Sequence, residues 1–241
     1  RGLAQLQFRM EDWDRAFKTY QTLLVHHRDT QQPQEAVEVF AKLGQIKLRL
    51  GERRKALNMF EKALELDPHH RPALEAVIEI QTQQNEWEAV ITAKRALIEQ
   101  ADGEQKYQLL SEIAEVYQGK LKNVEKSVAA LREALAVKPD AYPVLHRLVE
   151  LYSETKQWKR AVEMILKLAE LEASARLRAR YYYTAAVISR DEIRSLDDAL
   201  DLFDRSLDAT FSEVGPTTEL AAEQFKAFEA LDRICTAKKD W

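Results

Sequence analysis

The chain has 241 residues, of which 46% are hydrophobic and 32% charged, with only 6 glycines and 6 prolines. This composition is typical of long amphipathic helices and argues against a disordered chain and against a turn-rich β fold. The formal net charge of −4 gives no general excess of positive charge for binding a phosphate backbone. We therefore expect an all-α protein without a nucleic acid partner.

The chain has one cysteine, Cys235, which cannot form an internal disulfide, and no Cys/His cluster has the spacing of zinc ligands. The sequence thus predicts no metal site and no cofactor. No apolar run reaches the roughly 18 residues that span a bilayer, so we expect no direct membrane insertion. The localisation is open, with the cytoplasm favoured. The chain starts at Arg1, and we expect it to be a part of a longer protein, truncated at both ends.

A sequence pattern that recurs along the chain predicts a series of helix pairs. The pairs are expected near 1–10/13–27, 33–50/53–66, 72–84/86–100, 104–119/123–137, 142–155/158–172 and 176–193/196–208, followed by a lone helix near 217–238. An insertion at 119–123 is expected to lengthen one turn, and another at 191–195 to extend a helix.

One segment has the clearest repeat pattern: Phe40-x-x-Leu43-Gly44, then Gly51, Ala56-x-x-x-Phe60-x-x-Ala63 and Pro68. The pattern resembles the tetratricopeptide repeat (TPR), with Phe40 in the aromatic place and Lys47 replacing the usual tyrosine. Its second half recurs with small residues 33 to 40 positions apart, each followed one turn later by a packing residue. A small residue allows two helix backbones to approach closely. The small positions are Ala16, Ala56, Ala89, Ser127, Ala161 and Ala199.

The resemblance implies a right-handed superhelical solenoid of antiparallel helix pairs with about six to seven repeats. We expect one solenoid domain over 1–241. Its repeats are predicted at about 1–30, 33–70, 71–102, 103–139, 140–174 and 175–209, with a partial repeat at 216–241.

Other residues that could take part in chemistry have a simpler structural interpretation. No phosphate-binding loop, nucleophile elbow or HExxH motif is present, so the sequence predicts no enzyme. The pairs His26-His27 and His69-His70 are interpreted as solvated residues near helix ends. The run 181–183 is three tyrosines that span 200° of helical arc, so at least one should be exposed or line a groove. The tryptophans at the starts of second helices are interpreted as packing anchors rather than peptide-binding aromatics: Trp13, Trp87, Trp158 and Trp241.

In the family that the sequence resembles, the first helix of each repeat lines a concave groove that holds a partner. The same stripe here is acidic in its middle and basic toward the C-terminus. Two interpretations stay open: the glutamates solvate a helix face, or they complement a basic or extended partner segment. The candidate partner-binding residues are Gln45, Arg49, Glu75, Glu79, Glu112, Glu115, His146, Glu150, Glu154, Tyr183 and Arg190.

The function predicted from these features is a noncatalytic scaffold that binds another protein or peptide in the groove. The alternative is a self-assembling structural component of a multiprotein complex, with end-to-end self-association of this chain. RNA binding by a helical repeat is a third hypothesis, which the acidic stripe disfavours.

Overall fold

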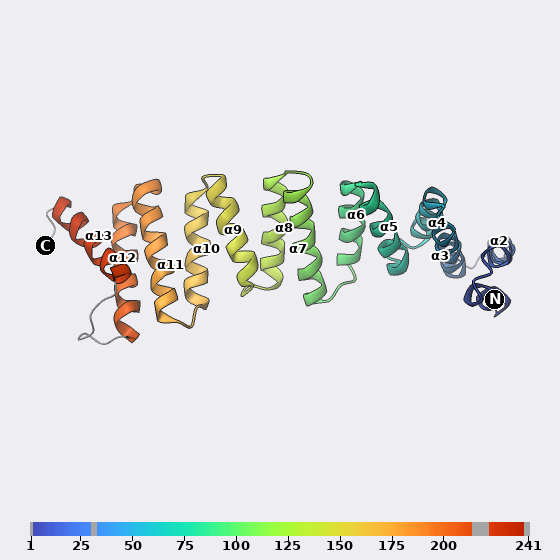
Figure 1. Ribbon diagram of the computed structural model, residues 1–241, viewed down its shortest axis with the longest axis horizontal. Coiled ribbons are helices and arrows are strands. Elements are labelled where there is room, and N and C mark those ends of the chain that lie inside the picture. Colours follow the sequence, from blue (N-terminus) through green and yellow to red (C-terminus); the bar gives the residue numbers. More distant parts are fainter. Residues whose placement is uncertain (1, 30–32, 214–221, 239–241) are drawn as a thin grey trace. The chain divides into compact units, whose positions relative to one another are not determined.

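The computed structural model describes residues 2–29, 33–213 and 222–238, and in these ranges the chain is all-α without a strand (Figure 1). The helices fall into two compact units, 1–123 and 124–241. The all-α class and the stacking of consecutive helices in pairs are confirmed. The single solenoid over 1–241, with its repeat boundaries, stays a prediction. Among the described helices, none is long and apolar enough to cross a membrane.

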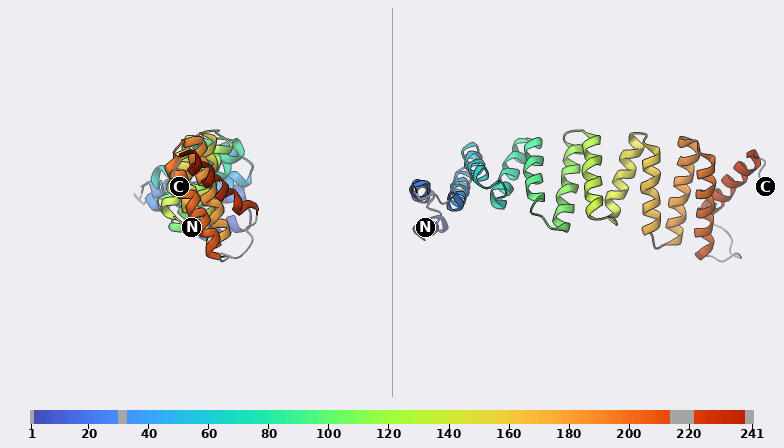
Figure 2. Two further views of the ribbon diagram at one scale, coloured as in Figure 1. Left: turned by 90° about the vertical axis from the view of Figure 1, so that its left-hand side faces the viewer. Right: turned by 180° about the vertical axis from the view of Figure 1, so that it is seen from behind.

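In the first unit each helix packs against the next one in the chain (Figures 1 and 2). Phe60 and Ile46 are fully buried at the α3–α4 pair, and Ile80 and Val90 at the α5–α6 pair. The core therefore runs along the stacked pairs instead of gathering at one centre. The helices are α1 (Gly2–Arg9), α2 (Trp13–Asp29), α3 (Pro33–Arg49), α4 (Arg53–Leu66), α5 (Arg71–Gln84), α6 (Trp87–Ile98) and α7 (Gly103–Gly119).

The second unit follows the same rule of packing between consecutive helices. Its largest buried side chains include Leu145, Leu148 and Phe203. The insertion expected at 191–195 is accommodated by a π-helical turn, Ser189–Ile193, which continues α11. The helices are α8 (Val124–Val137), α9 (Tyr142–Glu154), α10 (Trp158–Leu171), α11 (Ala175–Ile188), α12 (Leu196–Glu213) and α13 (Ala222–Lys238).

The turns between paired helices share one backbone conformation. A residue with positive φ stands two positions before the second helix. The amide of the residue that follows it donates a hydrogen bond back to a carbonyl near the end of the first helix, as Glu52 N does to the Lys47 carbonyl at 2.9 Å. Glycine adopts this conformation without a steric penalty, but Gly51 is the one glycine in the set. The positive-φ residues are Glu11, Gly51, Asn85, Lys122, Lys156 and Arg194.

These turns correct one position of the predicted repeat. Five residues after each positive-φ residue stands a buried side chain, and in the α5–α6 pair that residue is Val90, which is 1% exposed. Ala89, which we expected in the packed position, is half-buried and lies one residue out of register. Ala89 was predicted for this position because alanine is the smaller of the two residues, but the larger Val90 fits between the helices here. The buried set is Ala16, Ala56, Val90, Ser127, Ala161 and Ala199.

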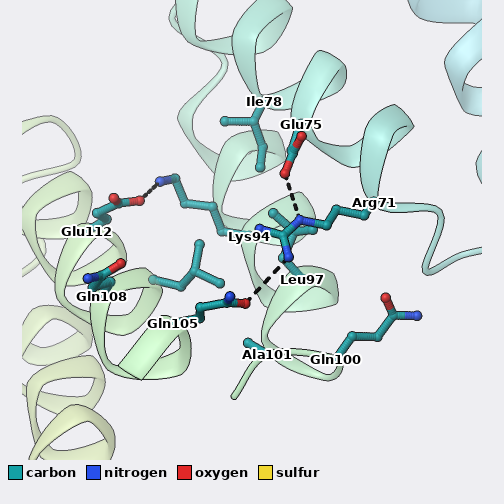
Figure 3. A pocket seen from close by; sticks show the side chains of 11 residues that line it. Arg71, Glu75, Ile78, Lys94, Leu97, Gln100, Ala101, Gln105, Gln108 and Glu112 are labelled. Atoms are coloured by element: carbon teal, nitrogen blue, oxygen red, sulfur yellow. Dashed lines mark hydrogen bonds and ion pairs between the residues drawn. The ribbon is translucent and has the colours of Figure 1, made fainter. Parts of the chain in front are cut away.

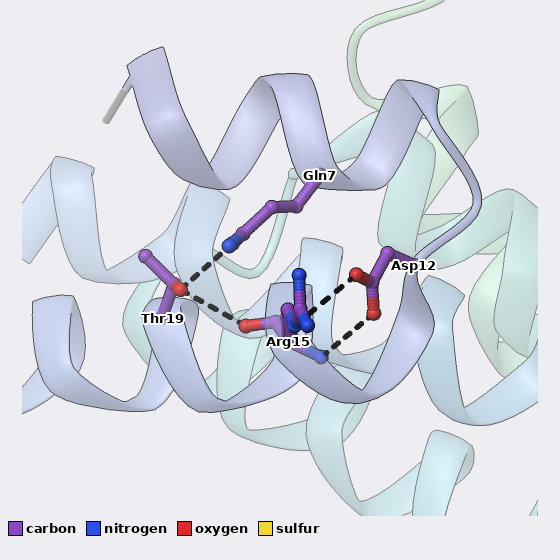
Figure 4. A network of polar contacts seen from close by, with 4 residues as sticks. All are labelled: Gln7, Asp12, Arg15 and Thr19. Carbon is purple, nitrogen blue, oxygen red and sulfur yellow. Dashed lines mark hydrogen bonds and ion pairs between the residues drawn. The ribbon is translucent and has the colours of Figure 1, made fainter.

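The first hairpin shows how polar side chains fix such a turn (Figure 4). Asp12 precedes α2 and accepts a hydrogen bond from the Arg15 amide at 3.3 Å, as N-cap residues do. The Thr19 hydroxyl lies 2.8 Å from Gln7 Oε1 and 2.9 Å from the Arg15 carbonyl oxygen. A contact between α1 and α2 therefore adds to their apolar packing.

The prediction for the tryptophans is confirmed in position for three of them, because Trp13, Trp87 and Trp158 open α2, α6 and α10. All three are half-buried. Trp13 packs edge-on against Phe8 with ring centroids 5.3 Å apart. Trp241 and the side chain of Cys235 lie outside the described residues.

Candidate functional site

A cavity of about 320 Å³ opens in the first unit between α5, α6 and α7 (Figure 3). Its apolar wall consists of Ile78, Leu97 and Leu109. Its polar wall carries two cations, two carboxylates and three amides, which are Arg71, Lys94, Glu75, Glu112, Gln100, Gln105 and Gln108. This mixture of an apolar floor and convergent polar groups is typical of a binding pocket.

Lys94 occupies a position that is otherwise part of the core. It stands nine residues after the positive-φ residue of its turn, and the residues at the same place in the other turns are all buried. The Lys94 side chain is only 13% exposed, and its ammonium forms an ion pair with Glu112 of α7, which is 53% exposed. The equivalent core residues are Tyr20, Phe60, Leu131, Ile165 and Phe203.

Arg71 forms the second polar connection across the pocket. Its Nε donates to Glu75 Oε1 at 2.8 Å, one turn away on α5, and its Nη1 lies 3.5 Å from Gln105 Oε1 on α7. Figure 3 shows Arg71 between these two partners and Lys94 reaching Glu112. The two predicted site residues Glu75 and Glu112 are thus brought to one pocket, where each carboxylate is neutralised by a cation.

The other predicted residues of the first unit lie on its surface. Arg49, Glu79 and Glu115 are exposed. Gln45 is half-buried and accepts a hydrogen bond from Lys42 at 3.0 Å. None of these four belongs to the set of residues that lines the pocket between α5, α6 and α7.

On α9 the three predicted residues are all exposed. His146 Nε2 lies 3.3 Å from the hydroxyl of Tyr181 on α11. Burial raises the pKa of Tyr181, so the phenol stays protonated at neutral pH. Glu150 accepts from Arg147 at 2.7 Å, and Glu154 follows it at the end of the helix.

Tyr183 and Arg190 meet at the ring of Phe203. The Tyr183 ring centroid is 5.6 Å from that of Phe203, and the Arg190 guanidinium lies 5.8 Å from the same ring. Arg190 also donates two hydrogen bonds to Asp191, which raise its own pKa and lower the pKa of the Asp191 carboxyl. Both residues are half-buried and contribute to packing in the second unit.

The three tyrosines of the run 181–183 are alike in their burial. Tyr181, Tyr182 and Tyr183 are all half-buried and pack against the core cluster of the second unit. His70 differs from its interpretation as a solvated residue, because it is 9% exposed with its Nε2 3.3 Å from Glu38. The side chains of His26 and His27 lie outside the described residues. No group of three or more metal-ligating side chains occurs in the described parts of the chain.

The side of the pocket that the second helix forms was not predicted from the sequence. The predicted site residues belong to first helices, whereas Lys94 and Leu97 come from a second helix. A signal existed in the sequence, because Lys94 stands 34 residues after Phe60, one TPR period, where an apolar residue is the rule. The register error at Ala89 hid this correspondence.

The stacked helix pairs and a polar pocket between neighbouring repeats define the chain as a helical-repeat protein of the tetratricopeptide type. The TPR resemblance is confirmed. A model of the Cilia and flagella-associated protein 70 middle TPR-like domain matches residues 1–130, more than half of the chain. The chain therefore belongs to this family of TPR-like domains. Repeat proteins of this type generally serve as protein–protein interaction scaffolds and are generally noncatalytic.

The chain is also similar to several solved structures. A tetratricopeptide repeat protein from Parabacteroides merdae is 14% identical, with 99% of this chain and 85% of that chain covered and a TM-score of 0.45. The MamA RS-1 ArsTM double mutant is 14% identical over 89% of this chain and 94% of its own, with a TM-score of 0.43. YrrB, described as a TPR protein with an unusual peptide-binding site, is 17% identical over 80% and 91%, with a TM-score of 0.39. A comparison with curated proteins found no match.

Proposed function

We propose that this chain is a noncatalytic scaffold that binds a partner protein or peptide along the surface of its first helices, in the groove that such helices line in TPR arrays. The observation that supports the proposal is the division of residues on these helices. Apolar residues are buried between neighbouring helices, while the charged residues that we expected in the stripe are solvent-exposed on α5, α7 and α9. Exposed charges on a rigid repeat surface steer association and select partners.

Each of the two units has exposed carboxylates of its own, outside the pocket, that fit a basic partner segment. On α5 and α7 these are Glu79 and Glu115, and on α9 they are Glu150 and Glu154. Attraction between such exposed groups and a basic segment is screened by salt, so it affects the association rate more than the final affinity. The partner's anchoring energy would come from a few buried contacts elsewhere.

The test is a double charge reversal, Glu79→Lys with Glu115→Lys, in the full-length protein, with partners captured by affinity purification and quantified by mass spectrometry. We expect partners of the wild type to be depleted several-fold. The matched control carries Glu61→Lys and Glu65→Lys, the same charge change on the second helix α4, where both residues are exposed. Equal partner sets for both variants and the wild type would reject the acidic surface as the binding site.

The family also suggests where the scaffold works. The matching model describes a domain of a protein that is associated with cilia and flagella. We infer that this chain works in an assembly of the same kind. A tagged full-length protein in a cell that builds cilia or flagella should accumulate in these organelles, and an even distribution through the cell body would contradict the inference.

A second candidate function is self-assembly, and an apolar surface on α1 favours it. Leu3, Leu6 and Met10 follow one face of α1 and its end, and they are 61%, 55% and 71% exposed. Light scattering over a concentration series would show a mass that rises with concentration. The variant Leu3→Glu with Leu6→Glu should suppress that rise, and a constant monomer mass in the wild type would dismiss self-assembly.

A further inference from the structure

We propose that the pocket between α5, α6 and α7 binds the carboxylate of an Asp or Glu side chain in an extended peptide, with Lys94 as the anchoring cation. This inference rests on the proposed scaffold function and names the chemistry of one of its contacts. It differs from the acidic-surface hypothesis, because the exposed glutamates of that hypothesis do not line the pocket.

Two residues that line the pocket differ in kind from their counterparts in the preceding repeat. In the α3–α4 pair the Phe60 ring lies so close to Gly44 that a methyl group there would stand 2.8 Å from the ring. The residues 34 positions later are Ile78 and Lys94, so the aromatic ring is absent and a long polar side chain lines the space. Both exchanged residues, Ile78 and Lys94, line the cavity of about 320 Å³.

The pocket is lined by two positive and two negative side chains, but these side chains differ in burial. The Lys94 side chain is 13% exposed, while its partner Glu112 is 53% exposed and Glu75 is 55% exposed. Water screens exposed charges far more strongly than buried ones, so the field inside the cavity is dominated by the ammonium. An arriving carboxylate can take over the ion pair, since Glu112 returns to water at little cost.

The remaining lining suits a peptide that carries such a carboxylate. Gln100, Gln105 and Gln108 offer amide donors and acceptors, which match the backbone groups of an extended chain. Ile78, Leu97 and Leu109 provide apolar contacts for neighbouring side chains. Arg71, at the mouth, is positioned by Glu75 and Gln105 and supplies a second cation.

The experiment titrates the chain 1–241, with isotope-labelled Ile and Leu methyl groups, with three blocked peptides of sequence acetyl-Gly-Ala-Leu-X-Leu-Ala-Gly-amide. X is Glu, Gln or Lys. The Glu peptide is expected to bind about tenfold more tightly than the Gln peptide, as a charge-assisted hydrogen bond predicts. Its resonance shifts should concentrate on Ile78, Leu97 and Leu109. A Gln peptide with a free C-terminus tests whether a terminal carboxylate serves as well as a side chain.

Two variants tie the preference to the pocket. Lys94→Met keeps the length of the side chain but removes its charge, and it should abolish the preference for Glu over Gln. The matched control is Lys106→Met, the same change at an exposed lysine of α7 that does not line the cavity, and it should keep the preference. The double variant Ile78→Gly with Lys94→Phe copies the preceding repeat and should lose the methyl shifts with all peptides.

Several results would overturn the inference: equal affinities for the Glu and Gln peptides, tighter binding of the Lys peptide, stronger binding through the free C-terminus than through Glu, or a Glu preference that survives Lys94→Met. These outcomes are separate from failure of the scaffold proposal. The peptides report on the pocket alone, whereas the reversal of Glu79 and Glu115 reports on the surface.

Discussion

The α3–α4 and α5–α6 pairs share the geometry of their turn but differ in how their interfaces are packed. Their second helices begin 34 residues apart, as do the positive-φ residues of their turns, Gly51 and Asn85. Ile46 corresponds in the same way to Ile80, and both isoleucines are buried. In the first pair Phe60 fills the interface against Gly44. In the second pair Ile78 and Lys94 line a polar cavity. One repeat is thus packed closed at this place, while its neighbour has a cavity.

The two repeats also differ at the position where the family usually has a tyrosine. At the place of the family's tyrosine, Lys47 packs over the Phe17 ring at 4.1 Å and forms an ion pair with Glu52 at 3.3 Å. The corresponding Gln81 is 9% exposed, and its side-chain carbonyl oxygen has no hydrogen-bond partner within the described structure. In both repeats the residue five positions after the positive-φ residue, Ala56 or Val90, stays buried although these other side chains differ.

The largest effect is expected from truncating the buried ring. Phe60→Ala should lower the free energy of unfolding by about 3–5 kcal/mol, because it leaves a cavity in a fully buried position. Lys94→Met, at the equivalent position, should change it by less than about 1 kcal/mol, because methionine keeps the length of the side chain and the remaining carboxylate of Glu112, which is 53% exposed, stays solvated. Urea unfolding followed by circular dichroism measures both. Equal losses of unfolding free energy in the two variants would contradict the proposed difference between the two repeats.

The next largest effect concerns the close approach at Gly44. Gly44→Ala should cost about 1–3 kcal/mol, because the added methyl group meets Cε1 and Cζ of Phe60 at 2.8 Å. Phe60→Leu in the same chain should recover part of this loss, which makes the two changes less than additive. Gly103→Ala is the control, because a methyl group there meets nothing within 4 Å. Equal unfolding midpoints for both alanine variants would contradict the packing.

A smaller gain is expected at Gln81. Gln81→Leu should stabilise the chain by about 1 kcal/mol, because it removes a buried oxygen that lacks a donor. Lys47→Leu should instead destabilise it by about 1 kcal/mol, through loss of the cation–ring contact with Phe17. Thermal unfolding of both variants measures whether each change raises or lowers stability. A change in the same direction for both variants would contradict the expected difference between the two positions.

The smallest effect depends on pH. A hydrogen bond from Lys55, together with Lys47, lowers the pKa of Glu52 below its ordinary value of 4.5. The ionised carboxylate therefore stabilises the fold above pH 4.5, and this contribution is lost as the pH falls through the lowered pKa. Glu52→Gln should unfold at lower urea than the wild type at pH 7, with the gap closing as the pH falls below 4.5 and through the lowered pKa. Glu86→Gln, beside Gln81, is the matched variant, and an identical pH-dependent gap there would contradict the role of the lysines.

Much of the architecture followed from the sequence. The period of the repeat, the small residues at Ala56 and Ala161 and the tryptophans that open second helices are local signals, and the helices begin and end within a few residues of the expected places. Local signals suffice here because each repeat packs mainly against its sequence neighbours. The family resemblance placed Glu79 and Glu115 on the stripe of the first helices, and both are exposed in the structure.

The sequence by itself determined the fold class, the helix pairs and the family resemblance, because all three depend on contacts close in the chain. Only the tertiary structure decided that Val90 replaces Ala89 in the packed position and that Lys94 of α6 meets Glu112 of α7. It also brought Arg71 and Gln105 together. Side chains from three helices form the pocket, and their distances depend on how those helices pack, which no single helical period encodes.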